Sequence, residues 1–355
     1  MQLNLKCNED FRVYYICART EISRIFIIQM DALTAELRQW PMLIILTIGQ
    51  ISNILTVLVL SRPKLRKTTC SLYLIGASVS NTICIFVSIF YILLSSGFGY
   101  SFTSKSRVLC KLFPYLYYST ILLASWFILL ACTDRYCSTH SRFVVRQFSR
   151  IIIAKRLLVL LPLFTFLIHI HILIYMDWIK IGQCTFLTYT FLVFFYIYYV
   201  VVYAFMTPIF YVIFAILTIY NVQKTKRRVV LAIERCTSVI LPPRRRQTLN
   251  AQLLLMLLGQ VCSFVILTMP LAAWNIYNAV TYYWTKSSTT RSVQSLLLVF
   301  FRYLTFINIG STGFIYALTS RFFRQELLAL FRCQWLRNTR HFPLFIVSRR
   351  ISPAS

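Results

Sequence analysis

Seven long stretches of this 355-residue chain contain no Asp, Glu, Lys or Arg. They cover residues 41–61, 68–104, 112–133, 157–176, 181–223, 247–285 and 303–320. Each is about 18 residues or longer, and roughly 20 apolar residues span the hydrocarbon core of a bilayer. The chain is 58% hydrophobic and only 13% charged, whereas about a quarter of the residues in a soluble domain are charged. The sequence therefore excludes soluble enzymes and predicts an all-α integral membrane protein, a seven-transmembrane helix bundle.

The distribution of charge predicts which way the bundle lies in the membrane. The net charge of +28 is typical of nucleic-acid binding, but the basic residues lie in short segments between apolar stretches and form no soluble domain. Most of the 37 Lys and Arg residues fall in alternate inter-helix segments and in the tail after residue 320, and most of the nine acids fall in the opposite segments. Because Lys and Arg favour cytoplasmic loops, we expect the N-terminus outside and the C-terminus inside.

One bundle with two flanking segments is expected. The divisions are an extracellular N-terminal tail at 1–38, the seven-transmembrane domain at 39–319, and a cytoplasmic amphipathic helix with a basic tail at 320–355. The helices are predicted at about 39–61, 69–96, 108–136, 152–175, 190–222, 249–277 and 293–318. A turn with extended backbone is expected near 181–187.

The segment after the seventh helix has the pattern of a short amphipathic helix. Phe323, Leu327, Leu330 and Phe331 recur at helical spacing among arginines, which is typical of a helix lying in the inner membrane interface. Cys333 at its end is positioned for palmitoylation, although an unmodified thiol would explain the residue nearly as well.

Two oppositely charged neighbours, Asp134 and Arg135, lie at the inner end of the predicted third helix. Ionisable side chains inside a membrane are costly and mark a functional site by default. The carboxylate can neutralise the guanidinium within the bundle. The alternative is an interfacial arginine whose charge reaches the lipid headgroups. This dipeptide on its own leaves both interpretations open.

Polar, proline and cysteine residues along the helices occur in an order that resembles the rhodopsin-like (class A) family of G-protein-coupled receptors, over about residues 41–333. Asp134, Arg135 and Tyr136 match the family's motif at the inner end of helix 3, and Cys110 lies at the family's spacing before them. The other matches are Asn53 in helix 1, Pro208 in helix 5, Phe264 and Pro270 in helix 6, and Asn308 and Tyr316 in helix 7.

The resemblance implies a multi-pass plasma-membrane receptor that binds an extracellular ligand and activates a heterotrimeric G protein. It implies no enzyme activity, no cofactor and no metal site. Asp134, Arg135 and Tyr136 would couple to the G protein. Residues of the other helices would form an activation network, which consists of Asn53, Asn81, Pro208, Phe264, Pro270, Asn308 and Tyr316. Cys110 would be disulfide-bonded to Cys184. The sequence leaves open whether Cys7 and Cys17 pair with each other.

The chain also departs from the family's pattern at several positions. Asn81 replaces the aspartate of helix 2, so we expect the family's sodium site to be weak or absent. Thr268 replaces the tryptophan of helix 6, and the Thr312-Gly313 pair replaces Asn-Pro in helix 7. Asn250 lies near the position of the usual inner acid of helix 6. These changes predict loose restraints on the resting state.

The outer half of the bundle limits the class of ligand. Helix 3 has no acid over residues 112–133 to hold an amine, and helix 7 has no lysine to form a retinal Schiff base. An aromatic cavity with a few polar groups suits a peptide or another small neutral or anionic ligand. An interfacial aromatic belt is the alternative role for the tyrosines. The candidate pocket residues are Tyr117, Tyr118, Trp274, Asn278 and Arg302.

The segment from Leu60 to Arg66 and the run into helix 2 look most like invertebrate neuropeptide receptors of the FMRFamide type. That resemblance implies a neuropeptide ligand. A channel or carrier without G-protein coupling is the alternative from another class. The few charges within the predicted helices, near their ends, disfavour a conduction path.

Overall fold

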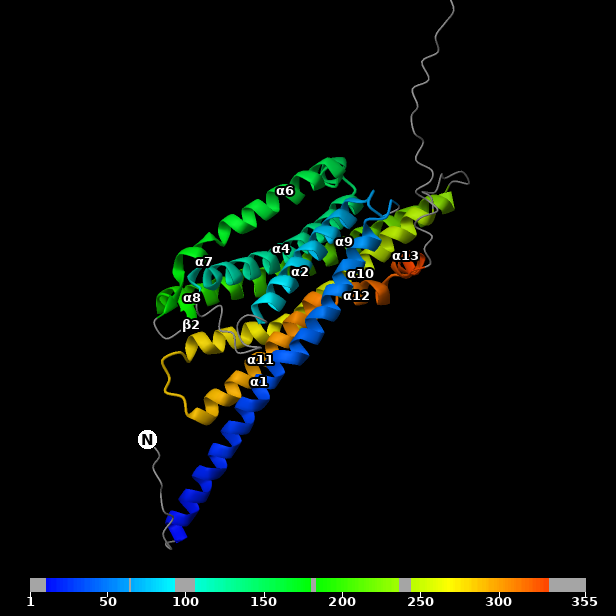
Figure 1. Ribbon diagram of the computed structural model, residues 1–355. Coiled ribbons are helices and arrows are strands. Elements are labelled where there is room, and N and C mark those ends of the chain that lie inside the picture. The colour runs from blue at the N-terminus through cyan, green and yellow to red at the C-terminus, as the bar shows by residue number, and fades with distance from the viewer. Residues whose placement is uncertain (1–10, 64, 93–105, 180–182, 236–243, 332–355) are drawn as a thin grey trace, which may run out of the picture.

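The computed structural model describes residues 11–63, 65–92, 106–179, 183–235 and 244–331, and within them seven helices are long and apolar enough to cross a membrane (Figure 1). The spans are Glu21–Leu60, Thr69–Tyr91, Arg107–Thr139, Ile151–Tyr175, Tyr189–Thr225, Ala251–Val280 and Ser288–Gly310. The predicted all-α bundle with a short helix after the last span is confirmed.

Several spans consist of more than one helical segment. The helices are α1 (Phe11–Leu60), α2 (Thr69–Ile92), α4 (Arg107–Thr139), α5 (Phe143–Gln147), α6 (Ile151–Ile168), α7 (Ile170–Tyr175), α8 (Tyr189–Tyr198), the π-helix η2 (Tyr199–Met206), α9 (Thr207–Arg235), α10 (Arg244–Val280), α11 (Ser288–Gly310), α12 (Thr312–Thr319) and α13 (Arg321–Phe331). The strands β1 (Met176–Ile179) and β2 (Gln183–Phe186) form an antiparallel hairpin. The extended turn expected near 181–187 is therefore one arm of this hairpin.

The first helix is longer than the sequence pattern predicted. α1 begins at Phe11 rather than near residue 39, so the predicted start is wrong. Residues 11–40 contain neither Pro nor Gly, the two residues that most disfavour a helix interior, so nothing local ends the helix outside the membrane. Its first part projects beyond the bundle (Figure 1).

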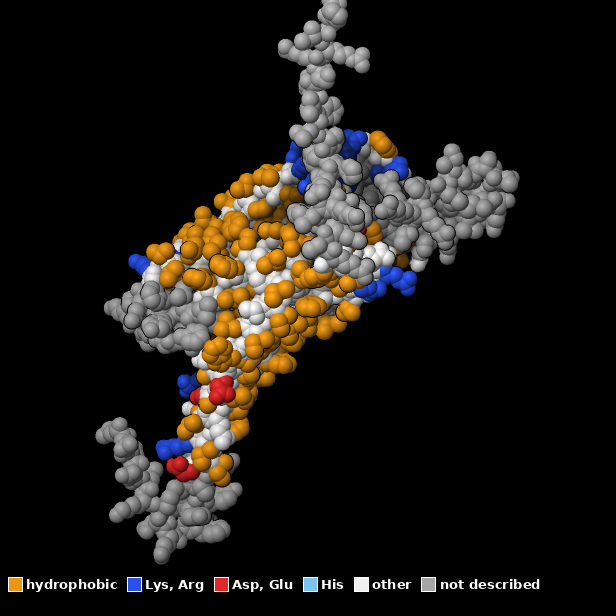
Figure 2. Space-filling view, turned by 45° about the vertical axis from the view of Figure 1, so that its right-hand side comes forward, with side chains coloured by type: hydrophobic (Ala, Val, Ile, Leu, Met, Phe, Trp, Pro, Cys, Tyr) orange, Lys and Arg blue, Asp and Glu red, His pale blue; other side chains and the backbone are white. Residues whose placement is uncertain are grey.

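The helices pack as a ring of neighbours. α1 lies against α2 and α11, α2 packs mainly on α4, α4 packs on α9, and α10 packs on α11. α6 is more peripheral and exposes apolar side chains such as Ile152, Leu163 and Leu167. The hydrophobic side chains that cover the flank of the bundle in Figure 2 fit a lipid-facing surface.

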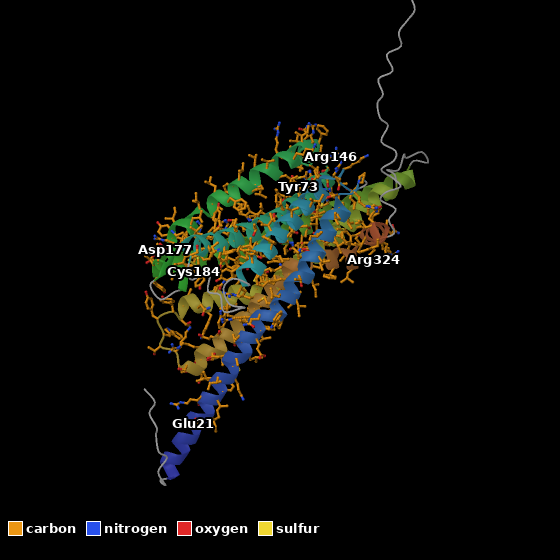
Figure 3. The ribbon with its side chains drawn as sticks, viewed as in Figure 1. Glu21, Tyr73, Arg146, Asp177, Cys184 and Arg324 are labelled. Carbon is orange, nitrogen blue, oxygen red and sulfur yellow. A yellow bond between two sulfur atoms is a disulfide. The ribbon has the colours of Figure 1, made fainter. Side chains whose placement is uncertain are left out.

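The charged ends of the bundle fit the predicted orientation. Arg146 and Arg324 lie at one end, where the basic inner segments emerge, and Asp177 and Cys184 lie at the other (Figure 3). Acidic and basic side chains of α1 continue outward from that second end (Figure 2). The outer and inner ends of the bundle therefore carry different sets of charged side chains.

Candidate functional site

The inner end of α4 holds a buried ion pair between neighbouring residues. Arg135 Nη2 donates to Asp134 Oδ2 at 2.7 Å, and the two residues are only 6% and 5% exposed. The interfacial alternative is therefore wrong, because the guanidinium is buried within the bundle. A charge held away from water requires a partner of this kind.

The second oxygen of the Asp134 carboxylate is held by two hydroxyl groups. Thr69 Oγ1, at the start of α2, donates to Asp134 Oδ1 at 2.6 Å, and Ser149 Oγ, just after α5, donates at 2.5 Å. Three elements thus converge on one carboxylate. Sequence reasoning did not identify either hydroxyl, and the only available signal was a polar residue next to the end of each predicted helix.

Arg135 lies where α4 meets α9 and α10. Together with Phe214 and Thr218 of α9 and Leu257 of α10, it lines a small cavity. The ring of Tyr136 packs near Phe214, with centroids 5.8 Å apart. Movement of α10 away from α4 would widen this cavity and expose the guanidinium, a rigid fork of five donors.

The inner part of α10 is tied to the junction of α12 and α13. Gln252 Oε1 accepts hydrogen bonds from Ser320 Oγ at 3.0 Å and from the backbone N–H of Phe322 at 2.8 Å. Ser320 is buried. The sequence pattern offered no indication of this contact, because a lone glutamine on a helix has no characteristic spacing to its partners.

A second buried ion pair fixes α13 to the segment after α1. Arg62 Nη1 donates to Glu326 Oε2 at 2.5 Å and to the Glu326 carbonyl at 3.2 Å. Both side chains are largely buried. Glu326 is the only acid after residue 234, and that isolation on a basic amphipathic helix was the one signal that could have revealed the pair.

The seventh span is interrupted at Ser311, between α11 and α12, although no proline is present there. The N–H of Gly313 donates to Ser52 Oγ at 3.1 Å. The carbonyl of Ile309, four residues earlier, accepts from Asn53 Nδ2 at 3.0 Å. In an uninterrupted helix the Gly313 N–H would donate to the Ile309 carbonyl. Here the side chains of Ser52 and Asn53 on α1 bind these two backbone groups instead. This contact explains how Thr312-Gly313 replaces Asn-Pro at a break in the helix.

Other members of the predicted activation network also connect neighbouring helices. Asn81 Nδ2 donates to Thr312 Oγ1 at 3.4 Å, and Ser263 Oγ donates to Asn308 Oδ1 at 3.3 Å. Tyr316 is fully buried and packs edge-on against Phe323, with centroids 5.8 Å apart. The predicted residues of α1, α2, α11 and α12 thus lie along one interior seam.

Pro208 and Phe264 lie around a region of widened helix. The π-helix η2 directly precedes Thr207 and Pro208, and proline cannot supply the backbone N–H that would continue a regular ladder. Phe264 of α10 packs edge-on against Tyr203 and Tyr211, with centroids 5.2 and 5.5 Å away. Pro270 lies within α10, six residues beyond Phe264. Segments of π-helix within α-helices occur frequently at functional sites.

The outer hairpin is bound to the start of α4 in two ways. Cys110 and Cys184 form a disulfide, with Cα atoms 5.6 Å apart, which confirms the predicted pairing. Asp177 on β1 forms an ion pair with Arg107, and Lys111 Nζ lies 3.9 Å from the same carboxylate. The hairpin is therefore fixed over the outer end of the bundle.

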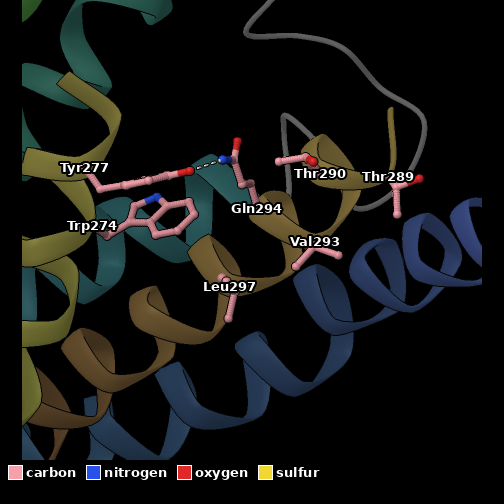
Figure 4. A pocket seen from close by; sticks show the side chains of 7 residues that line it. All are labelled: Trp274, Tyr277, Thr289, Thr290, Val293, Gln294 and Leu297. Carbon is pink, nitrogen blue, oxygen red and sulfur yellow. Dashed lines mark hydrogen bonds between the residues drawn. The ribbon is translucent and has the colours of Figure 1, made fainter. Parts of the chain in front are cut away.

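Two of the five candidate pocket residues, Trp274 and Asn278, line different pockets in the described part of the chain. Trp274 lines a pocket of about 390 Å³ between α10 and α11, where Gln294 Nε2 donates to Tyr277 at 2.9 Å (Figure 4). Asn278 lines a separate pocket of about 510 Å³. Tyr117 and Tyr118 pack edge-on against each other, with centroids 5.1 Å apart.

Arg302 lies on α11, and four other predicted residues lie partly or wholly outside the described part of the chain. Arg302 is exposed, and it lies within electrostatic range of Tyr118 on α4 and Tyr196 on α8. Cys7 and Cys333 lie outside the described residues, as do the side chains of Cys17 and Asn250, so the predictions for these positions stay predictions.

Comparison with models of protein families gives a match. The family model described as "7 transmembrane receptor (rhodopsin family)" matches residues 52–316, which is most of the chain. No curated protein matches the sequence. The matched range includes the buried ion pair, the disulfide and the interior seam.

Proposed function

The chain belongs to the rhodopsin family of seven-transmembrane receptors, and we propose that its extracellular ligand is a peptide. Members of this family are multi-pass plasma-membrane proteins that activate heterotrimeric G proteins and are not enzymes. The receptor therefore transmits the binding of an outer ligand to a G protein inside the cell. A channel or carrier does not account for this membership.

The proposed coupling mechanism rests on the buried Asp134–Arg135 pair. In the closed bundle the carboxylate holds the guanidinium beside α9 and α10. Ligand binding shifts a pre-existing equilibrium toward a state in which α10 has swung outward about Pro270. Arg135 then leaves Asp134 and meets the G protein, while Tyr136 and the basic inner segments hold the partner.

The proposed peptide ligand rests on the outer pockets. Trp274 is 9% exposed, and its Nε1 has no hydrogen-bond partner among the described residues. Because a buried donor without a partner is costly, a carbonyl oxygen of a bound peptide would satisfy it. The neighbouring pocket has polar and aromatic walls, as sites for peptides commonly do.

A neuropeptide is the finer form of this proposal. It rests on the similarity of the segment from Leu60 to Arg66 to receptors of the FMRFamide type. This segment lies at the inner face, where Arg62 holds Glu326. The segment therefore contacts no outer ligand itself. It supports a neuropeptide ligand only through its sequence similarity to these receptors.

A screen of short synthetic peptides tests the proposal. Cells expressing the receptor are exposed to the peptides while calcium and cyclic AMP are recorded. A peptide that acts through this receptor should give a response that is absent from cells expressing Arg135→Ala in the same surface amount. An equal response in the two cell lines would contradict the coupling mechanism. Failure of every peptide would contradict the proposed ligand class.

A further inference from the structure

The larger of the two outer pockets is basic. It lies between the outer parts of α8 and α10 and the segment that leads into α11, and its volume is about 510 Å³. Two of its residues are cations, Lys286 and Arg291. The rest of the lining is aromatic, polar or aliphatic and consists of Leu192, Tyr196, Asn278, Tyr282, Trp284 and Thr285.

The sequence around Lys286 and Arg291 contains no acidic residue that could neutralise them. Between Asp177 and Glu326 the only acid in the sequence is Glu234, which lies at the inner end of α9. Asp177 is itself held by Arg107 and Lys111. Among the described residues, no ion pair includes Lys286 or Arg291. The described lining of the pocket therefore carries a net positive charge.

Lys286 is held in place without being neutralised. Its Nζ donates to Thr281 Oγ1 at 2.8 Å and lies 5.1 Å from the centre of the Tyr277 ring. An ammonium group has three donors, so others stay available to an anion in the pocket. These contacts restrict a side chain that is otherwise flexible.

Arg302 extends the positive charge into the bundle. It follows Arg291 by eleven residues on α11, which is about three helical turns, so the two side chains leave nearly the same face of the helix. Arg302 lies within electrostatic range of Tyr196, which lines the pocket, and of Tyr118 deeper inside. Arg302 thus places a further cation on that face of α11, about three helical turns beyond Arg291.

We propose that this pocket binds a carboxylate of the peptide ligand, with Arg291 and Lys286 as its partners. Arg can bind a carboxylate through two parallel hydrogen bonds. The rings of Tyr196, Tyr282 and Trp284 would pack on the residues beside it. The carboxylate belongs to an acidic side chain or to a free C-terminus. An amidated peptide with only basic side chains would be repelled, so the inference narrows the neuropeptide proposal on which it rests.

Four pools of synthetic hexapeptides distinguish these sources. One pool has acidic side chains and an amidated C-terminus, and a second has neutral side chains and a free carboxylate. The third is neutral and amidated, and the fourth is basic and amidated. Each pool is applied to membranes that contain the receptor and its G protein, and nucleotide exchange is measured against peptide concentration. Arg291→Glu and Lys286→Gln are compared with Arg24→Glu, which changes an exposed cation on the outer part of α1.

The first or second pool should activate the unmodified receptor, and the more potent of the two identifies the source of the carboxylate. Arg291→Glu should raise the concentration needed for half-maximal exchange at least tenfold, and Lys286→Gln should raise it less. Arg24→Glu should leave it unchanged. If the basic or neutral amidated pool activates the receptor and Arg291→Glu responds identically, this inference is wrong and the peptide proposal stands. If no pool activates a receptor that shows basal exchange, both are wrong.

Discussion

Gln252 of α10 and Ser320, between α12 and α13, share a hydrogen bond of 3.0 Å, and the same glutamine oxygen accepts the N–H of Phe322. The family's usual acid on the inner part of helix 6 is missing from this chain. A neutral side chain instead ties α10 to the last helices of the bundle. The resting position of α10 therefore depends on α12 and α13 as well as on α4.

Gln252→Ala should raise ligand-independent signalling. The change removes two hydrogen bonds that must break when α10 swings outward, and each contributes about 1 kcal/mol, or roughly fivefold in an equilibrium constant. Together the two bonds amount to roughly twenty-fivefold, so basal nucleotide exchange should rise by about an order of magnitude or more at matched surface expression.

Two substitutions serve as controls for this change. Gln252→Glu retains the accepting oxygen and should stay close to the unmodified receptor. Gln223→Ala removes an exposed glutamine on α9 and should have no effect. Unaltered basal exchange in Gln252→Ala would show that this contact does not restrain α10.

Gly49→Ala should destabilise the receptor. A Cβ at position 49 would lie 2.8 Å from the Cα of Gly310, so two backbones would have to separate. A Cβ at Gly259 would lie 2.8 Å from Ile315 Cγ2 and 3.1 Å from Thr319 Cγ2, so it would meet side-chain methyl groups and no backbone atom. Overpacking that cannot relax costs about 1–3 kcal/mol. The melting temperature of the detergent-solubilised receptor should fall by several degrees for Gly49→Ala and by less for Gly259→Ala. Equal shifts would contradict the close contact of α1 and α11.

Cys110→Ala and Cys184→Ala should each reduce surface expression and ligand response. The disulfide closes a segment of 74 residues, and a crosslink over such a length stabilises a fold by a few kcal/mol in the chain-entropy model, about 4 here. The double variant should resemble the single ones, because either change breaks the same bond. Alkylation of the intact protein should leave both residues unlabelled. Labelling of both would refute the pairing.

Asn81→Asp should introduce a response to sodium that the unmodified receptor lacks. Asn81 contacts Thr312 through its amide, and a neutral amide attracts a cation far less than a carboxylate does. Ligand binding is measured in sodium chloride and in N-methylglucamine chloride at equal ionic strength. A sodium-specific change in the unmodified receptor would contradict this prediction.

The sequence predicts those features that depend on composition or on an ordered set of motifs. The seven spans follow from length and apolarity, and the Cys110–Cys184 pairing follows from the family's spacing. Contacts such as Thr69 with Asp134, or Gln252 with Ser320, depend on which polar side chains meet when distant helices pack. Their sequence separations have no fixed pattern. The start of α1 was predicted wrongly because the loss of apolar character marks the edge of a membrane and does not end a helix.

Asp134→Asn should raise basal signalling, and Arg135→Ala should abolish signalling. Asparagine still accepts from Thr69 and Ser149 but lacks the charge that holds the guanidinium. Arg135→Ala removes the group that meets the G protein, so ligand affinity should change only by the lost coupling, about 1–3 kcal/mol.

Asp177→Asn serves as the control, because it breaks an ion pair at the outer end and should leave basal exchange unaltered. The Asp134→Asn/Gln252→Ala double variant should show the product of the two single effects, because the two contacts share no residue. Basal and stimulated nucleotide exchange are measured at equal surface expression, and full signalling by Arg135→Ala would refute the mechanism.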